Sequence, residues 1–253
     1  VARNPAVAAM EIATLAQLGP GRLVAGFGHG VQAWMAQMGA ATRSPLTTMD
    51  EVLTVVRRLL AGETVSFNGS EVTMSEVALD RPPDPVPPVL AGVRGPKSVA
   101  LAGRLADGVL LAEGAGPSYA RWARTQAGNP AVFRVMVFSA LCITDDAKEA
   151  HTIMAPFVAG LVHAHNPSLD HHPHGDEIRQ RVNERGVDGL VDMPGSWWRE
   201  LGAIGTLDDA MAHLDALHQA GVEAVSLFPA PDVAIAREQL DDVARLATAR
   251  SPG

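Results

Sequence analysis

Residues 86–111, VPPVLAGVRGPKSVALAGRLADGVLL, decide the fold class of this chain. The apolar run 88–92 predicts a strand that is buried on both faces, as the strands of parallel sheets are. Pro96 is typical of the first position of a helix, and the run 109–112 predicts a second strand directly after that helix. A strand, a helix and a second strand in this order predict a parallel α/β fold.

The same alternation extends toward both ends of the chain. Helical spacing of apolar residues predicts helices over 5–18, 47–61, 119–127, 205–217 and 234–249. Short apolar runs predict further strands over 22–28, 133–143 and 220–229. The segment 65–83 alternates about Asn68-Gly69 and predicts a small hairpin. About five parallel-type strands fit either a doubly wound sheet or part of an eight-stranded barrel.

Length and composition favour one domain. With 253 residues and 47% hydrophobic content, residues 1–253 are expected to form a single domain around one core. Residues 145–200 interrupt the alternation and are interpreted as an insertion before the last strand. Apart from the short proline-rich stretch 81–88, no linker-like composition marks a domain boundary.

Charge and cysteine content exclude several classes of partner. The net charge of -8 disfavours binding to nucleic acid or to an anionic membrane surface. No stretch reaches the roughly 18 apolar residues of a membrane span. The single Cys142 excludes an internal disulfide and is expected to be a small buried hydrophobe. We therefore expect a soluble, cytoplasmic protein with a small-molecule substrate.

The loop that opens the central helix is the strongest candidate for a ligand site. Unbonded backbone N–H groups at a helix start, together with the helix dipole, attract an anion such as phosphate. The candidate residues are Gly92, Val93, Arg94, Gly95, Pro96 and Lys97. The alternative is an ordinary strand-to-helix turn with solvated basic side chains. The spacing lacks the G-x-G-x-x-G fingerprint of dinucleotide-binding folds, which disfavours a nicotinamide domain.

A second candidate site follows the strand 22–28, because residues beyond the carboxyl ends of parallel strands form the sites of barrels and open sheets. His29 is the candidate catalytic residue, able to donate or accept a proton near neutral pH, or else to hydrogen-bond a cofactor edge or a carboxylate. For Trp34 there are two alternatives: the indole stacks on the planar ring of a ligand, or it fills a packing interface. The same rule selects Gly28, Gly30, Glu113, Ser139 and Phe228.

The histidine-rich segment does not predict a metal site. Six of the nine histidines lie between His151 and His174, yet no H-E-x-x-H or comparable ligand spacing accompanies them. We expect a solvated loop and no metal. Trp197 and Trp198 predict a lid or a subunit contact rather than a platform for bases, because no basic groove accompanies them.

Three segments resemble the luciferase-like monooxygenase superfamily. Residues 3–30, RNPAVAAMEIATLAQLGPGRLVAGFGHG, are similar to its N-P-x-x-x-A helix and G-x-G-x-G strand end. Residues 86–111 are similar to its A-G-x-x-A-D-G segment, and residues 205–227, GTLDDAMAHLDALHQAGVEAVSL, to its G-T ending. The similarity is greatest to the branch of the methylenetetrahydromethanopterin reductases.

The resemblance implies a (β/α)8 TIM barrel of the bacterial-luciferase type, assembled as a homodimer. It implies a flavoprotein-like oxidoreductase that uses coenzyme F420 for hydride transfer or FMN for monooxygenation. It places the cofactor phosphate on the backbone around Arg94, Gly95 and Pro96, with Ala112 and Glu113 nearby. His29 is then expected at the ring end of the cofactor.

The resemblance departs at the start of the chain, because family members carry further strands before the first helix. We therefore expect an N-terminally incomplete barrel with about five of the eight βα units. The alternative function is a catalytically inactive incomplete barrel that binds a phosphorylated ligand or a partner subunit. A sugar-phosphate isomerase or aldolase is disfavoured, because no lysine at a strand end and no carboxylate pair support it.

Overall fold

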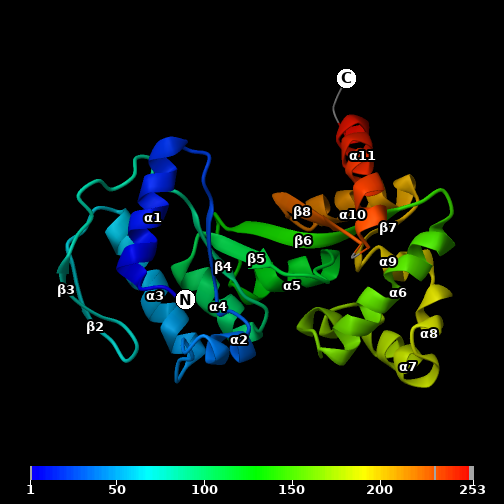
Figure 1. Ribbon diagram of the computed structural model, residues 1–253, viewed down its shortest axis with the longest axis horizontal. Coiled ribbons are helices and arrows are strands. Elements are labelled where there is room, and N and C mark those ends of the chain that lie inside the picture. Colours follow the sequence, from blue (N-terminus) through cyan, green and yellow to red (C-terminus); the bar gives the residue numbers. More distant parts are fainter. Residues whose placement is uncertain (1, 231, 251–253) are drawn as a thin grey trace. The chain divides into compact units, whose positions relative to one another are not determined.

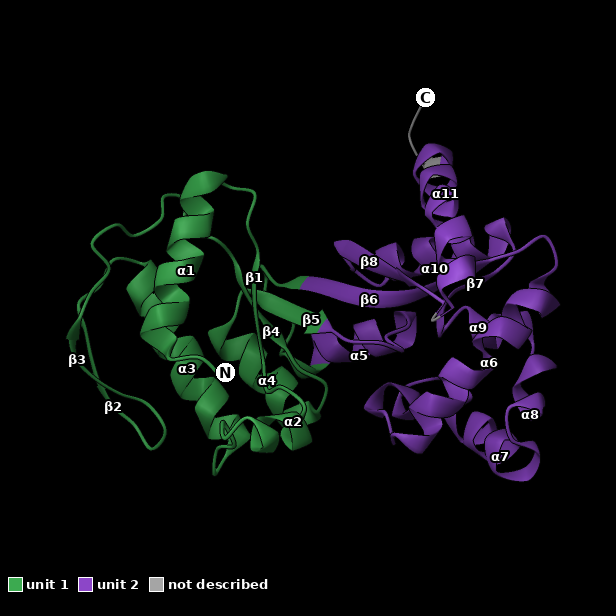
Figure 2. Ribbon diagram, in the orientation of Figure 1, with its two compact units in different colours: residues 1–110, 126–134 green, residues 111–125, 135–253 purple. Residues whose placement is uncertain are grey.

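The computed structural model describes residues 2–230 and 232–250, which group into two compact units (Figures 1 and 2). The first unit takes in the chain up to residue 110 together with residues 126–134. The second takes in residues 111–125 and the chain from residue 135 onward. That residues 1–253 form a single domain stays a prediction.

The first unit is built on three parallel strands. Strand β1 (Ala25–Gly28) pairs with β4 (Val89–Gly92), and β4 pairs with β5 (Gly108–Leu111). The helices of this unit are α1 (Pro5–Leu18), α2 (Gln32–Gln37), α3 (Pro45–Leu60) and α4 (Pro96–Leu105). The predicted strands and the helices α1, α3 and α4 are confirmed, whereas the short α2 was not predicted.

Asp107 holds the amino ends of this sheet together. Its Oδ2 accepts hydrogen bonds from Arg57 Nη1 of α3 at 2.6 Å and from the backbone N–H of Val89 at 2.8 Å. The Asp of the A-D-G motif is therefore a structural residue that joins a helix to two strands. A cavity of about 560 Å³ opens beside it, lined by Arg57, Pro88 and Arg134 among others. It lies at the amino ends of the strands, whereas ligand sites of parallel sheets lie at the carboxyl ends.

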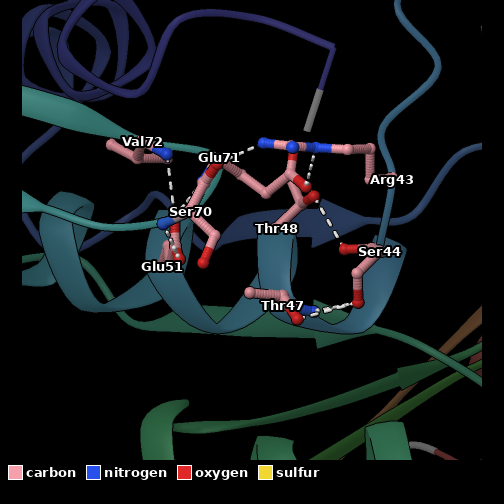
Figure 3. Close-up of polar contacts among 8 residues, drawn as sticks. All are labelled: Arg43, Ser44, Thr47, Thr48, Glu51, Ser70, Glu71 and Val72. Atoms are coloured by element: carbon pink, nitrogen blue, oxygen red, sulfur yellow. Dashed lines mark hydrogen bonds and ion pairs between the residues drawn. The ribbon is translucent and has the colours of Figure 1, made fainter.

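The predicted hairpin at Asn68-Gly69 is confirmed as β2 (Val65–Asn68) and β3 (Thr73–Val77). The carboxylate of Glu51, on α3, accepts hydrogen bonds from the backbone N–H groups of Ser70, Glu71 and Val72 at 2.7 to 2.8 Å (Figure 3). The glutamate side chain is nearly buried. Its three bonds therefore anchor the hairpin turn to the helix.

The second unit is built on a strand that pairs on both sides. Strand β6 (Arg134–Ile143) is parallel to β7 (Gly202–Gly205) and to β8 (Ala224–Pro229). The surrounding elements are α5 (Pro117–Gln126), α6 (Ala147–His163), the 3-10 helix η1 (Pro167–Asp170), α7 (Gly175–Arg185), α8 (Asp188–Val191), α9 (Gly195–Trp198), α10 (Leu207–Gln219) and α11 (Val233–Arg250).

Strand β7 is a correction to the expected strand count. The described residues contain six parallel strands rather than about five, because the short buried run Gly202–Gly205 forms a strand that was not predicted. The helical segment within 145–200 therefore precedes the last two strands, not only the last one. Whether this segment is an insertion stays a prediction.

Two expectations for the 145–200 segment are wrong, the lid or subunit contact for Trp198 and the fully solvated histidine-rich loop. Trp198 is fully buried and stacks on His151 with ring centroids 4.6 Å apart, so it is a core residue rather than a lid or subunit contact. His172 is also buried, and the ring of His171 stacks on Trp122 at 3.9 Å. The expected solvated loop is thus packed through His171 and His174 against neighbouring aromatic rings, whereas His163 and His165 are exposed.

Candidate active site

The carboxyl ends of β1 and β4 meet at a pair of glycines in the first unit. Gly28 and Gly92 are partners in the parallel ladder. A Cβ atom on Gly28 would lie 3.2 Å from the carbonyl oxygen of Gly92, closer than side chains normally approach. Glycine at position 28 therefore lets the two strand ends lie in close contact, and the residues that follow both strands share one edge of the sheet.

His29 is joined to the helix that follows β4. Its Nε2 shares a hydrogen bond of 2.9 Å with the hydroxyl of Ser98, in the first turn of α4. Burial lowers the pKa of His29 below its ordinary value, an effect that a backbone hydrogen bond at Pro45 partly opposes. A half-buried, neutral imidazole held by a hydroxyl is suited to donate or accept one proton.

Ser98 was missed by the sequence interpretation. It lies only one residue beyond the predicted loop Gly92 to Lys97, so the position itself was within reach. Its hydrogen bond to His29, 69 positions away, could not be predicted from the sequence, because it depends on how β1 pairs with β4.

The amino end of α4 is open to an anion. Its N-cap, Gly95, has no side chain to cap the helix, and no acidic residue occupies the first turn. The helices α1, α3, α6 and α10 are capped by their own side chains, Asn4, Ser44, Asp146 and Thr206. A Cβ on Gly95 would have no atom of the described residues within 4 Å. The backbone N–H groups and the dipole of α4 therefore remain available to a ligand.

The other predicted residues of this unit differ in their surroundings. The side chain of Trp34, on α2, is 63% exposed, so it does not fill a packing interface within this unit. Gly30 has a φ of +73°, and a Cβ there would lie 2.8 Å from the sulfur of Met35, so a structural need explains this glycine. Val93 has a buried side chain and offers a ligand only its backbone, whereas Lys97 is exposed.

Ala112 and Glu113 belong to the second unit, where they follow β5. Ala112 is half-buried and Glu113 is exposed. The carbonyl oxygen of Glu113 accepts a hydrogen bond of 3.2 Å from Nδ2 of Asn166.

Ser139 and Phe228, also selected from strand ends, are packing residues. The Ser139 hydroxyl is buried and hydrogen-bonded to Nε2 of His213 at 2.8 Å. Phe228 meets Phe157 edge to face with ring centroids 5.7 Å apart. The contacts of Ser139 and Phe228 are thus with neighbouring side chains of the second unit.

Two further observations concern metals and membranes. Within residues 2–230 and 232–250, no three His, Cys, Asp or Glu side chains gather closely enough to hold a metal ion. The helices of the same residues are all too short or too polar to span a lipid bilayer.

Comparison with known proteins gives matches along most of the chain. The chain is 28% identical over 235 residues to 5,10-methylenetetrahydromethanopterin reductase from Methanolobus tindarius. The match covers 87% of this chain and 72% of that protein. An F420-dependent secondary alcohol dehydrogenase in complex with an F420-acetone adduct superposes with a TM-score of 0.68 at 22% identity, covering 95% of this chain and 74% of that one.

A third protein shares the fold but carries a different cofactor. The oxygenating constituent of 3,6-diketocamphane monooxygenase from Pseudomonas putida, in complex with FMN, superposes with a TM-score of 0.65 at 16% identity. The match covers 96% of this chain and 72% of that one. These structural similarities confirm the predicted α/β fold of the TIM-barrel type. The family model for luciferase-like monooxygenases matches residues 1–224, and the chain therefore belongs to the luciferase-like monooxygenase family.

Proposed function

We propose that this chain is an oxidoreductase that binds coenzyme F420 or FMN with the cofactor phosphate at the amino end of α4. The observation that carries the proposal is the uncapped N-terminus at Gly95, one residue after Arg94 and two before Lys97. The family membership supports a redox cofactor, and the names of two similar proteins state F420 and FMN. The phosphate accepts hydrogen bonds from the backbone, while the two basic side chains add charge.

His29 is proposed to contact the ring end of the cofactor. When bound, F420 supplies hydride transfer, and reduced FMN supplies the activation of oxygen. The part of this chain is to hold the ring and to handle one proton. Neutral His29 is suited to that task because the hydrogen bond between its Nε2 and the Ser98 hydroxyl fixes the orientation of the ring. Gly28, Gly30, Trp34, Gly92, Val93, Pro96, Ala112 and Glu113 complete the proposed contacts.

The proposal also covers the assembly of the protein and its location in the cell. A homodimer is proposed from the family resemblance, and light scattering tests it. A cytoplasmic location is proposed as well, and fractionation of cells that make the protein tests it. The alternative of a catalytically inactive barrel is less well supported, because the named relatives are enzymes.

The test is fluorescence titration of the purified protein with coenzyme F420 and with FMN. The decisive variant is Gly95→Ala, because the added methyl group meets no atom of the described residues. It would lie where the proposed phosphate approaches the backbone. We expect cofactor affinity to fall about tenfold or more, with little change in unfolding.

The matched control is Gly160→Ala, at an exposed position of α6 where a Cβ also has no described atom within 4 Å. This variant is expected to bind the cofactor as the wild type does. Failure of the wild type to bind either cofactor would overturn the proposed function. Equal affinity of Gly95→Ala and wild type would remove the phosphate from the amino end of α4.

A further inference from the structure

The loop between β5 and α5 is held by residues that come much later in the chain. This loop, residues 112–116, carries Ala112 and Glu113, for which contact with the cofactor is proposed. The contacts that hold this loop lie within the second unit. They come from Asn166 and Ser168, at the start of η1, and from Glu200, the second residue after α9, all within the segment 145–200.

Glu200 supplies the cap that α5 lacks. The helix starts at Pro117, directly after Gly116, which has no side chain to cap it. Oε2 of Glu200 accepts the backbone N–H of Ser118 at 2.9 Å, and Oε1 accepts the Ser118 hydroxyl at 3.1 Å. A carboxylate at this position satisfies an N–H group of the first turn and opposes the positive end of the helix dipole.

The backbone of Glu200 also touches the loop. A Cβ on Gly116 would lie 1.8 Å from the carbonyl oxygen of Glu200. Any side chain at position 116 would therefore clash with the backbone of Glu200, and glycine is required there. Arg121 donates to the Ser118 hydroxyl at 2.9 Å and lies 3.9 Å from the Glu200 carboxylate. Glu200 is therefore fixed against the start of α5 through both its backbone and its side chain.

The other end of the loop is held from η1. Asn166 donates to the carbonyl oxygen of Glu113 at 3.2 Å, and its own Oδ1 accepts the backbone N–H of Ser168. Gly114 has a φ of +82°, and a Cβ there would lie 2.6 Å from the Ser168 hydroxyl oxygen. Both ends of the five-residue loop are thus constrained.

We propose that Glu200 is a positioning residue that sets the conformation of the loop carrying Ala112 and Glu113, and through it the affinity for the cofactor. The inference rests on the proposed function. It assigns to Glu200 no contact with substrate or cofactor. A bound anion at the start of α5 is excluded by the same geometry, because the protein's own carboxylate occupies that position.

The experiment compares Glu200→Ala, Glu200→Gln and wild type in full-length protein. Glu200→Ala removes both hydrogen bonds to Ser118, and we expect the Kd for the cofactor to rise about tenfold. Glu200→Gln keeps an oxygen that accepts the Ser118 N–H, so affinity should recover to within about threefold of wild type.

A second readout does not depend on activity. Hydrogen exchange followed by mass spectrometry should show faster exchange of peptides spanning residues 112–118 in Glu200→Ala without cofactor. The matched control is Asp146→Ala, which removes a side-chain cap of the same kind, to Lys148 N at 3.0 Å, from α6. It should lower stability while leaving the exchange of 112–118 and the cofactor Kd unchanged.

The outcomes separate the two proposals. If wild type binds neither F420 nor FMN, the proposed function fails, and this inference fails with it. If wild type binds but Glu200→Ala changes the Kd no more than Asp146→Ala does, only the positioning role of Glu200 is overturned. Unchanged exchange of residues 112–118 in Glu200→Ala likewise contradicts it.

Discussion

At the scale of single residues, the second unit contains two buried histidines that are hydrogen-bonded at both ring nitrogens. His213 donates from Nδ1 to the carbonyl oxygen of Arg199 at 2.6 Å and accepts from Ser139 at Nε2. His172 donates from Nε2 to the carbonyl oxygen of Trp197 at 3.0 Å and accepts the backbone N–H of His174 at Nδ1. A second proton on His172 would face the backbone N–H of His174, so that ring must stay neutral, whereas the Ser139 hydroxyl beside His213 can also accept a hydrogen bond.

His213 should make stability depend on pH. Burial, the largest cause, lowers its pKa from 6.5 to about 4. Between these values the unfolded chain binds more protons than the folded one, so stability is complete above about pH 6.5 and falls as the pH approaches 4. We expect His213 alone to account for a loss of about 3 kcal/mol across this window, measured by urea unfolding at each pH.

His213→Ala should be less stable than wild type at pH 7 but should show a smaller loss on acidification. The control is His163→Ala, at an exposed position of α6, which should keep the wild-type pH profile. A His213→Ala profile parallel to that of wild type would show that His213 is not responsible for the loss.

At the scale of elements, α3 and the β2–β3 hairpin are joined through one carboxylate. Burial by itself would raise the pKa of Glu51, but the three backbone hydrogen bonds outweigh it, so the pKa lies below its ordinary value. The carboxylate therefore stabilises the fold at neutral pH, and this stabilisation is lost as the pH falls through that lowered pKa. Gly69 is part of the same arrangement, since a Cβ there would lie 2.4 Å from Cδ of Glu51.

Glu51→Ala should lower the free energy of unfolding by about 2–4 kcal/mol, because three charge-assisted hydrogen bonds are lost. Gly69→Ala should also destabilise wild type, by displacing the Glu51 side chain, but should cost little in a Glu51→Ala background. Denaturant unfolding of the double-mutant cycle measures this coupling. Glu63→Ala, which breaks an exposed ion pair with Arg58, is the control and should cost about 1 kcal/mol or less. Additive effects of Glu51→Ala and Gly69→Ala would contradict the proposed contact.

At the scale of the whole molecule, cofactor binding and folding are linked. A ligand that binds only the folded chain should raise the free energy of unfolding by about 2.7 kcal/mol at a concentration 100 times its Kd. We expect the effective cofactor, F420 or FMN, to do so in urea unfolding, and the other to have a smaller effect. No change with either cofactor would contradict folded-state binding.

Hydrogen exchange in the presence of the effective cofactor tests the residues predicted in each unit. Peptides covering 92–98 and 112–116 should both gain protection if Gly92 to Lys97 and Ala112 to Glu113 contact the cofactor. Protection confined to 92–98 would support the phosphate site at α4 and remove Ala112 and Glu113 from the proposed contacts.

Local signals predicted much of the fold and part of the candidate site. Pro96 after a buried strand predicts α4, the spacing over 47–61 predicts α3, and Asn68-Gly69 predicts the hairpin, because each signal acts within a few residues. The loop Gly92 to Lys97 was likewise selected by its place between a strand and a helix. Strand β7 was missed, because four small and apolar residues carry no periodicity.

By itself, then, the sequence determined the order of helices and strands, the family resemblance and the position of the α4 loop. Only the tertiary structure decided that Ser98 holds His29, that Glu51 caps a hairpin and that Glu200 caps α5. Glu200 and Ser118 are 82 residues apart in the chain. Local propensity acts between near neighbours, whereas a hydrogen bond between distant residues exists only after packing brings their elements together.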